Sequence, residues 1–304
     1  MSTTTTRSGR PRLSDRAKEE RRLGWKLAGP AFVIMILVTF YPILQAVYTS
    51  LFQYRLTDPG SRQFVLFENY LIVLRDPLWW QAFGTTALIT VVTVVVELVL
   101  GFLIALAMAK VLDGRGLLRT IVLIPYSIIT VVSAFSWLYA FATDTGFVDP
   151  LLNSLTFGIF PKDFDWFGDF WASMVPICVS EIWKTTPFMS LLLLAGLTQI
   201  DSAMEEAAIV DGATWGERMR RVVLPNMKSA IMVALLFRTL DNIFIMPVGS
   251  HDTASLSLVA YNQTISRTEV GLGSAVSVLL FLCVVVIAVI FVRGFRVDLA
   301  QGRR

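Results

Sequence analysis

Long runs of apolar residues alternate with short polar connections along almost the whole chain. A helix that crosses a bilayer needs about 20 consecutive, mostly apolar residues. The stretches that meet this requirement are residues 27–51, 82–109, 117–142, 171–198, 229–249 and 270–292. Charged residues make up only 16% of the chain and apolar residues 55%, whereas charged residues are about a quarter of a soluble domain. The pattern therefore predicts an all-α membrane protein with six transmembrane helices.

The distribution of charge predicts which way these helices face, because Lys and Arg accumulate in cytoplasmic connections. Basic residues gather in the two termini and in the second and fourth connections: Arg7, Arg10, Arg12, Arg16, Lys18, Arg21, Arg22, Lys26, Lys110, Arg115, Arg119, Arg218, Arg220, Arg221, Lys228, Arg293, Arg296, Arg303 and Arg304. The third connection is instead acidic, with Asp144, Asp149, Asp163, Asp165 and Asp169 against Lys162. We therefore expect both termini and the fourth connection to lie in the cytoplasm.

The polar ends of the chain set the expected domain boundaries. Residues 1–24 are polar and basic, and we expect them to form a disordered cytoplasmic tail. One transmembrane domain should follow over residues 25–295, with a short cytoplasmic tail over residues 296–304. The first apolar run follows a basic region, as in a signal peptide, but it is too long and no small-x-small cleavage pattern follows it. We interpret this run as a retained first helix.

The fourth connection contains a spaced pattern of acidic, small and turn-forming residues. Glu206, Ala207 and Ala208 are followed after three residues by Gly212, and nine residues later comes Val222-Val223-Leu224-Pro225. The small side chains of the alanine pair allow a partner surface to approach the backbone closely. Gly212 can end a helix because glycine readily adopts the left-handed conformation.

The same connection carries signals for where its helices begin. Ser202 and Glu205 have the spacing of a capping box, which predicts a helix that starts at Ser202. Trp215, Met219 and Val222 follow at helical spacing and form an apolar stripe. Pro225 suits the first turn of a further helix, where its missing N–H is no loss.

This pattern resembles the cytoplasmic-loop signature of ABC importer permeases. The stretches EIWKTTPFMSLLLLAGL (181–197) and FRTLDN (237–242) are similar to the carbohydrate branch of that family, and within it to permeases for trehalose. The resemblance covers about residues 25–295 and implies the type I permease fold in the inner membrane. It also implies that residues 202–212 form a coupling helix seated in a groove of an ATPase. The residues implied in that contact are Glu205, Glu206, Ala207, Ala208, Asp211, Gly212, Leu224 and Pro225.

The resemblance further implies a multisubunit sugar importer that works by alternating access. Its partners would be a second homologous permease, two copies of an ABC ATPase and an extracytoplasmic solute-binding lipoprotein. We expect the lipoprotein to contact small loops, including the one around Trp166 and Phe167. ATP and Mg²⁺ should bind to the partner ATPase, since this chain has no G-x-x-x-x-G-K-[ST] phosphate loop. We expect no cofactor in this chain and no nucleic-acid partner.

Ionisable residues inside the predicted spans are the candidates for a solute path. A charge at the bilayer centre costs at least about 2.5–3.5 kcal/mol, so it should face the bundle interior or a wet cavity. Glu181 and Lys184 are three residues apart, as are Arg238 and Asp241, so each pair shares a helix face. These pairs either neutralise each other or line the path. The full candidate set is Glu97, Glu181, Trp183, Lys184, Phe188, Arg238, Asp241 and Asn242.

Other function classes fit the sequence less well. An ion-gradient-driven carrier would use Glu97 or Glu181 as an ion site, but it leaves the loop pattern unexplained. Maltose and glycerol phosphate remain open as alternative solutes of an ABC permease. The chain has one histidine, no Cys-x-x-Cys and no HExxH, so we expect no catalytic residues and no metal site. Cys178 and Cys283 lie in apolar stretches and are expected to be buried free thiols.

Overall fold

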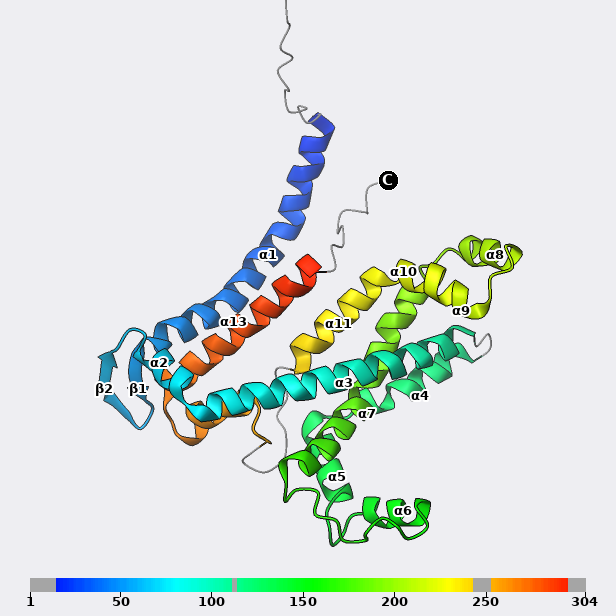
Figure 1. Ribbon diagram of the computed structural model, residues 1–304. Coiled ribbons are helices and arrows are strands. Elements are labelled where there is room, and N and C mark those ends of the chain that lie inside the picture. The colour runs from blue at the N-terminus through cyan, green and yellow to red at the C-terminus, as the bar shows by residue number, and fades with distance from the viewer. Residues whose placement is uncertain (1–14, 111–113, 243–252, 295–304) are drawn as a thin grey trace, which may run out of the picture.

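The computed structural model of the chain describes residues 15–110, 114–242 and 253–294 (Figure 1). Four of its helices are long and apolar enough to cross a membrane: α1 (Asp15–Ser50), α3 (Pro77–Lys110), α7 (Phe170–Leu197) and α13 (Val270–Gly294). They correspond to the first, second, fourth and sixth predicted spans. Helix α1 packs against α13, and α3 packs against α7. This arrangement confirms the expected helical membrane architecture.

The first helix begins earlier than the composition predicts. Helix α1 starts at Asp15, so the expectation of a disordered tail is wrong for residues 15–24, whereas residues 1–14 lie outside the described part of the chain. None of the most apolar part of α1 is buried within this chain. Large apolar side chains such as Leu37 and Val38 are mostly exposed, which is the pattern of a helix that faces lipid or a partner subunit.

The third predicted span is broken rather than continuous. Helix α4 (Arg115–Ser127) and helix α5 (Thr130–Ala140) meet at an angle of 80°. Pro125 lies in the last turn of α4, and Ile128 after it has an extended backbone with φ −74° and ψ 133°. Proline removes a backbone donor and disturbs the preceding turn, which accounts for this break. The prediction of one continuous helix over residues 117–142 is therefore wrong.

The fifth predicted span is also bent. Trp215–Arg218 (α9), the π-helix η1 at Met219–Val223 and Leu224–Asn226 (α10) form one helical segment. This segment turns by 67° into α11, Lys228–Asn242. Residues 243–249, the rest of the predicted span, lie outside the described residues. If each bent pair is one span, the described residues contain up to six spans by length and composition.

Short elements cover the two ends of the bundle. They are β1 (Phe52–Arg55), β2 (Asp58–Phe64), α2 (Glu68–Arg75), α6 (Val148–Leu155), α8 (Ser202–Val210), α12 (Leu256–Tyr261) and the π-helix η3 (Asn262–Ser266). Strands β1 and β2 form an antiparallel hairpin, in which Phe52 pairs with Phe64. The prediction of a purely helical protein missed this hairpin, because a strand of four residues has too few positions to show an alternating pattern.

The acidic third connection folds into a small lobe with its own core. Trp166 is only 7% exposed and packs with Ala140 and Phe141. Its indole N–H donates to Oδ1 of Asp149 at 2.6 Å, and the backbone N–H of Phe164 donates to Oδ2 at 3.0 Å. The Trp166 side chain therefore holds this lobe together, and contact between a partner and the loop around Trp166 and Phe167 stays a prediction.

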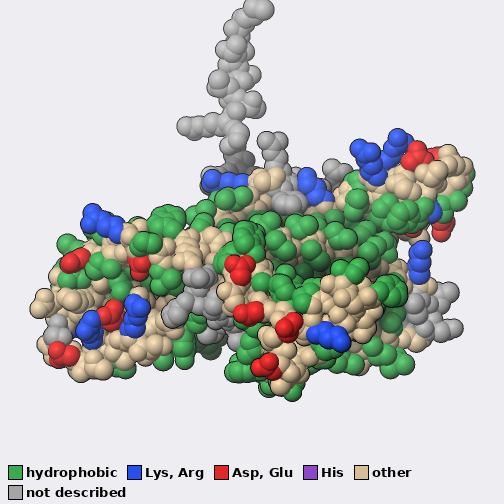
Figure 2. All heavy atoms as spheres, turned by 60° about the horizontal axis from the view of Figure 1, so that its bottom comes forward, with side chains coloured by type: hydrophobic (Ala, Val, Ile, Leu, Met, Phe, Trp, Pro, Cys, Tyr) green, Lys and Arg blue, Asp and Glu red, His purple; other side chains and the backbone are tan. Residues whose placement is uncertain are grey.

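Figure 1 shows the Asp15 end of α1, the Gly294 end of α13 and the α8–α10 segment on the same side of the bundle. The hairpin and α6 lie on the other side. On the face shown in Figure 2, apolar side chains form a broad band, and several basic side chains cluster over the α8–α10 end. Acidic side chains are prominent over the lobe that contains α6. Basic and acidic side chains thus gather at opposite ends of the bundle on this face, and the orientation across the membrane stays a prediction.

Gly271 provides a test of the packing between α13 and the hairpin. A Cβ added at Gly271 would collide with the carbonyl oxygen of Phe52 and lie 3.0 Å from the backbone nitrogen of Tyr54. Because backbone atoms cannot yield as a flexible side chain can, we expect Gly271→Ala to destabilise the protein by about 1–3 kcal/mol. A lower melting temperature of the purified protein would show this loss. Gly84→Ala is the matched helical control, since its added Cβ meets nothing within 4 Å; equal melting of the two variants would contradict the packing.

Candidate functional site

The 199–228 loop, the connection between α7 and α11, is built around the short helix α8. Asp201 is the N-cap of α8, and its carboxylate accepts a hydrogen bond from the backbone N–H of Ala203 at 3.0 Å. The prediction of a capping box at Ser202 and Glu205 is therefore wrong by one residue. Asp201 has the extended backbone that an N-cap needs, so Ser202 becomes the first helical residue and Glu205 is free to point elsewhere.

The end of α8 matches its prediction. Gly212 has a φ of 77°, which is in the left-handed region. The N–H of Gly212 donates to the carbonyl of Ile209 at 3.0 Å, and the N–H of Ala213 donates to the carbonyl of Ala208 at 2.9 Å. This pair of bonds is a Schellman motif, which stops a helix sharply and requires a residue that tolerates positive φ. The chain therefore turns away from α8 at a fixed angle.

Helix α8 presents an unusually open surface. None of its residues is buried, and Met204, Ile209 and Val210 are 47%, 54% and 86% exposed. Glu205 and Ala208 are partly covered, whereas the other residues predicted to contact a partner are exposed: Glu206, Ala207, Asp211, Gly212, Leu224 and Pro225. An exposed helix with apolar and small side chains is a suitable surface for docking another protein.

A capping box does occur in this loop, but at the start of α9. The hydroxyl of Thr214 accepts from the backbone N–H of Glu217, and the Glu217 carboxylate accepts from the backbone N–H of Thr214 at 3.0 Å. These bonds to Thr214 hold the pKa of Glu217 below its ordinary value. The carboxylate's stabilising effect is thus present above the ordinary pKa of glutamate and is lost as the pH falls through the lowered pKa.

The loop is joined rigidly to the membrane helices through its buried side. Val223 and Met227 are 3% and 0% exposed and pack with Met108 of α3 and Met189 of α7. The sequence predicted Val222 on the apolar stripe, but Val223 takes that place. Residues 219–223 form a π-helix, whose wider turn brings Val223, four residues after Met219, onto the buried face. Movement of the loop must therefore be shared with α3, α7 and α11.

The second candidate region is a buried ionic cluster centred on Arg238 of α11. The Arg238 cluster comprises Arg238, Glu97 of α3, Glu181 and Thr185 of α7, and Asp241 and Asn242 of α11. Arg238 and Glu97 are 1% and 0% exposed. They form a bidentate pair, with Nε to Oε2 at 2.6 Å and Nη2 to Oε1 at 2.9 Å. This pair joins α3 to α11 in the middle of the bundle.

Additional carboxylates share the same guanidinium. Arg238 Nη1 donates to Asp241 at 2.5 Å, and Nη2 donates to Glu181 at 3.1 Å. The hydroxyl of Thr185 donates to Glu97 at 2.7 Å. The side chain of Asp241 is 66% exposed, that of Glu181 is 13% exposed, and that of Glu97 is fully buried. The cluster thus runs from a buried anchor to an open carboxylate.

The pairing inside the bundle differs partly from the predicted pairing. Arg238 and Asp241 do pair, as their spacing predicted. Glu181 pairs with Arg238 instead of Lys184, whose ammonium donates to the hydroxyl of Thr130. Glu97 also belongs to this network, because it forms the bidentate pair with Arg238. Helix spacing could find the Arg238–Asp241 pair, but it could not find contacts that join different helices.

The predicted aromatic residues lie next to this cluster along α7. Phe188 stacks on Tyr126 with ring centroids 5.2 Å apart, and Trp183 meets Trp137 edge-on at 5.6 Å. Trp183 remains 40% exposed. Sequence reasoning missed two threonines that extend the cluster, Thr185 and Thr93, the latter accepting from the Asn242 amide at 2.9 Å. The spacing of Thr185, four residues after Glu181, was the available signal for the first.

No metal site or disulfide is found among the described residues. No group of three or more His, Cys, Asp or Glu side chains is arranged to hold a metal ion in the part of the chain that the structure covers. Cys178 and Cys283 are both free thiols, and each is partly buried within this chain. The clustered chemistry among these residues is ionic and hydrogen-bonding.

Comparison with known proteins gives a consistent result. A family model described as the binding-protein-dependent transport system inner membrane component matches residues 97–298. The trehalose transport system permease SugA of Mycobacterium tuberculosis is 45% identical over 282 residues, which cover 91% of this chain and 89% of SugA. The trehalose/maltose permease MalF of Thermococcus litoralis is 34% identical over 282 residues, covering 90% of this chain and 94% of MalF.

Solved structures show the same fold. A bacterial ABC transporter involved in the import of the polysaccharide alginate contains a chain that superposes with a TM-score of 0.73. The alignment covers 95% of this chain and 100% of that chain, at 19% sequence identity. At this level of identity the likeness concerns the fold alone.

Removal of the central guanidinium tests the Arg238 cluster. Arg238→Gln leaves Glu97 buried without its charged partner, so we expect a loss of about 3–5 kcal/mol in stability. The melting temperature should fall strongly, and Glu97→Gln combined with Arg238→Gln should recover part of the loss. Lys184→Gln is the control, because Lys184 lies outside the cluster and should cost much less. A melting temperature of Arg238→Gln equal to that of the wild type would refute the anchoring role of Arg238.

Proposed function

Because the chain belongs to the binding-protein-dependent transport system inner membrane component family, we propose that it is the permease subunit of an ATP-driven importer for a sugar. It is an inner-membrane protein with several apolar helices. The sugar is a disaccharide such as trehalose, which is supported by the names of the relatives SugA and MalF. On this proposal, a partner subunit hydrolyses ATP.

The observation that carries this proposal is the exposed helix α8. It has no buried residue, yet its flanking segments continue into α7 on one side and into the buried Val223 and Met227 on the other. A partner that binds α8 can therefore move α7 and α11 without itself entering the membrane. This geometry fits a coupling helix that seats in a groove of an ATPase, with Glu206 as an ionic or hydrogen-bonding anchor.

The complete importer would contain several further subunits. These are a second homologous permease, two copies of an ABC ATPase that bind ATP and Mg²⁺, and an extracytoplasmic solute-binding lipoprotein. ATP binding would bring the ATPases together and shift α8, and the linked helices α7 and α11 would then open the proposed solute path beside the Arg238 cluster outward. ATP can drive this change only because it binds the two conformations with different affinity.

The open end of the Arg238 cluster supplies the proposed solute contacts. Asp241 and Glu181 can accept hydrogen bonds from sugar hydroxyls, and Lys184 can donate to them. The exposed ring of Trp183 can pack against the C–H face of a sugar. The buried members, Glu97, Arg238 and Asn242, then act as the anchor that holds these groups in place. Phe188, stacked on Tyr126, borders the same helix face.

Charge reversal on α8 tests the coupling proposal. Glu206→Arg should abolish ATP-driven sugar uptake and weaken co-purification of the ATPase, because a repulsive charge would then sit in the docked surface. Uptake into proteoliposomes that contain the whole complex measures the first effect. Asp144→Arg is the control, since it reverses an exposed acid on the opposite end of the bundle. Full uptake by Glu206→Arg would overturn the proposal, as would uptake that survives ATP depletion and stops with an uncoupler.

Removal of one open carboxylate tests the solute path. Asp241→Asn should raise the KM for sugar about tenfold, the effect of losing one charge-assisted hydrogen bond. Its melting temperature should stay near that of the wild type, because Arg238 keeps Glu97 and Glu181. Initial rates of uptake at a series of sugar concentrations give the KM, and Asp144→Asn serves as the control for charge. An unchanged KM would remove Asp241 from the path.

A further inference from the structure

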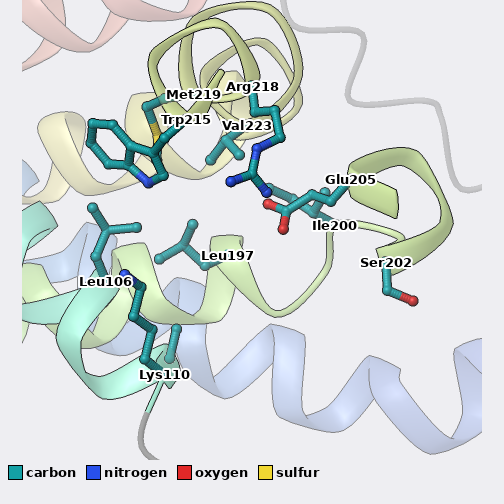
Figure 3. Close-up of a pocket in the computed structure, with 11 residues that line it drawn as sticks. Leu106, Lys110, Leu197, Ile200, Ser202, Glu205, Trp215, Arg218, Met219 and Val223 are labelled. Atoms are coloured by element: carbon teal, nitrogen blue, oxygen red, sulfur yellow. The ribbon is translucent and has the colours of Figure 1, made fainter. Parts of the chain in front are cut away.

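A cavity of about 370 Å³ lies between the ends of α3 and α7 and the α8–α9 arm (Figure 3). This volume falls within the range of about 300–1,000 Å³ that is usual for small-ligand pockets. Apolar side chains form much of its wall, including Leu106 of α3, Leu197 of α7 and Trp215 of α9. The cavity is separate from the Arg238 cluster, and helix α8 contributes Ser202 and Glu205 to its wall.

Charged side chains also line this cavity, and they come from three different elements. Lys110 ends α3, Arg218 ends α9, and Glu205 lies on α8. Figure 3 shows the guanidinium of Arg218 and the carboxylate of Glu205 pointing toward each other inside the cavity. Figure 3 shows the ammonium of Lys110 beside Leu106, across the cavity from this pair. The cavity wall therefore carries two cations and one carboxylate within a largely apolar lining.

One atom in this cavity lacks a partner. The Nε of Arg218 is buried, and it has no hydrogen-bond acceptor among the described residues. A buried N–H on a charged group is costly when it is left unsatisfied. Glu205 does not supply the missing bond, although it faces the same guanidinium. The guanidinium of Arg218 therefore has donor capacity that no acceptor among the described residues uses.

We propose that this cavity binds a phosphate group, either the headgroup of an anionic phospholipid or a free phosphate. A phosphate oxygen would accept from the guanidinium of Arg218, because guanidinium geometry suits phosphate oxygens. The ammonium of Lys110 would add a second positive contact. Leu106, Leu197 and Trp215 supply apolar surface for the upper part of an acyl chain, and basic pockets between helices are known settings for lipid headgroups.

Occupancy of this site would link the arm to the membrane helices. The phosphate would join Arg218 on α9 to Lys110 on α3, which otherwise belong to separate elements. Because Glu205 of α8 shares the cavity, the bound group would also restrain the orientation of the helix proposed to dock the ATPase. Binding of a phosphate group at this site would therefore limit the movement of α8 relative to α3.

Native mass spectrometry of the full-length chain tests this proposal. The chain is purified from vesicles of phosphatidylcholine mixed with phosphatidylglycerol, and the retained lipid is counted. We expect the wild type to retain phosphatidylglycerol in preference to phosphatidylcholine, and Arg218→Gln and Lys110→Gln to retain it with about tenfold lower affinity. Arg220→Gln is the matched control, since Arg220 is exposed, belongs to the same segment and does not line this cavity.

A second arm distinguishes the source of the phosphate. Inorganic phosphate is added to the chain in neutral detergent, and the melting temperature is followed. Stabilisation that depends on Arg218 with no retained lipid supports a soluble phosphate as the ligand. Retained phosphatidylglycerol that inorganic phosphate does not displace supports the lipid. Equal lipid retention by wild type and Arg218→Gln, together with no effect of phosphate on melting, overturns the proposal. Arg218→Gln and Arg220→Gln should melt alike without phosphate, which excludes misfolding.

Discussion

The buried ion pair between Arg238 and Glu97 is the constraint around which the rest of the bundle is arranged. A guanidinium and a carboxylate that are almost completely excluded from solvent are tolerated only with good geometry and further hydrogen bonds. Here the bidentate contact and the hydroxyl of Thr185 meet those needs. Because the partners lie on α3 and α11, and Thr185 lies on α7, these helices cannot separate at this depth without exposing an unpaired charge. The cluster can open only at its Asp241 end.

The same helices carry the intramembrane cluster and the 199–228 loop. Helix α7 holds Glu181 and continues into α8, while α11 holds Arg238 and begins directly after Met227. The apolar cluster around Met189, Val223 and Met227 fills the space between these two levels. A force on α8 would therefore reach the Arg238 cluster through well-packed side chains. The proposed coupling helix and the proposed solute path are thus connected through α7 and α11, and the cavity lined by Lys110 and Arg218 lies beside this connection.

Single buried polar residues organise the loops at the opposite end of the bundle. Asp149 holds the lobe around α6 through Trp166 and Phe164. Asn69 similarly donates to the carbonyls of Ser50 at 2.8 Å and Phe52 at 2.9 Å, which fixes α2 against the hairpin. Each side chain satisfies backbone or indole groups that would otherwise be buried without partners. Asp149 and Trp166, which lie in a polar connection of the sequence, therefore have a structural role in this lobe. A partner that binds here would have to contact the residues around them.

The sequence by itself determined the apolar helices, the polarity of their ends and the turn at Gly212, because hydrophobic length, charge distribution and glycine conformation are local properties. It also placed the Arg238–Asp241 pair, since helix geometry relates positions three residues apart. Only the tertiary structure decided that Glu97 pairs with Arg238, because these residues are separated by 141 positions. It likewise decided the break after Pro125, the burial of Trp166 and the choice of Val223 over Val222. Those outcomes depend on which surfaces meet in three dimensions, and no local pattern along the chain encodes that.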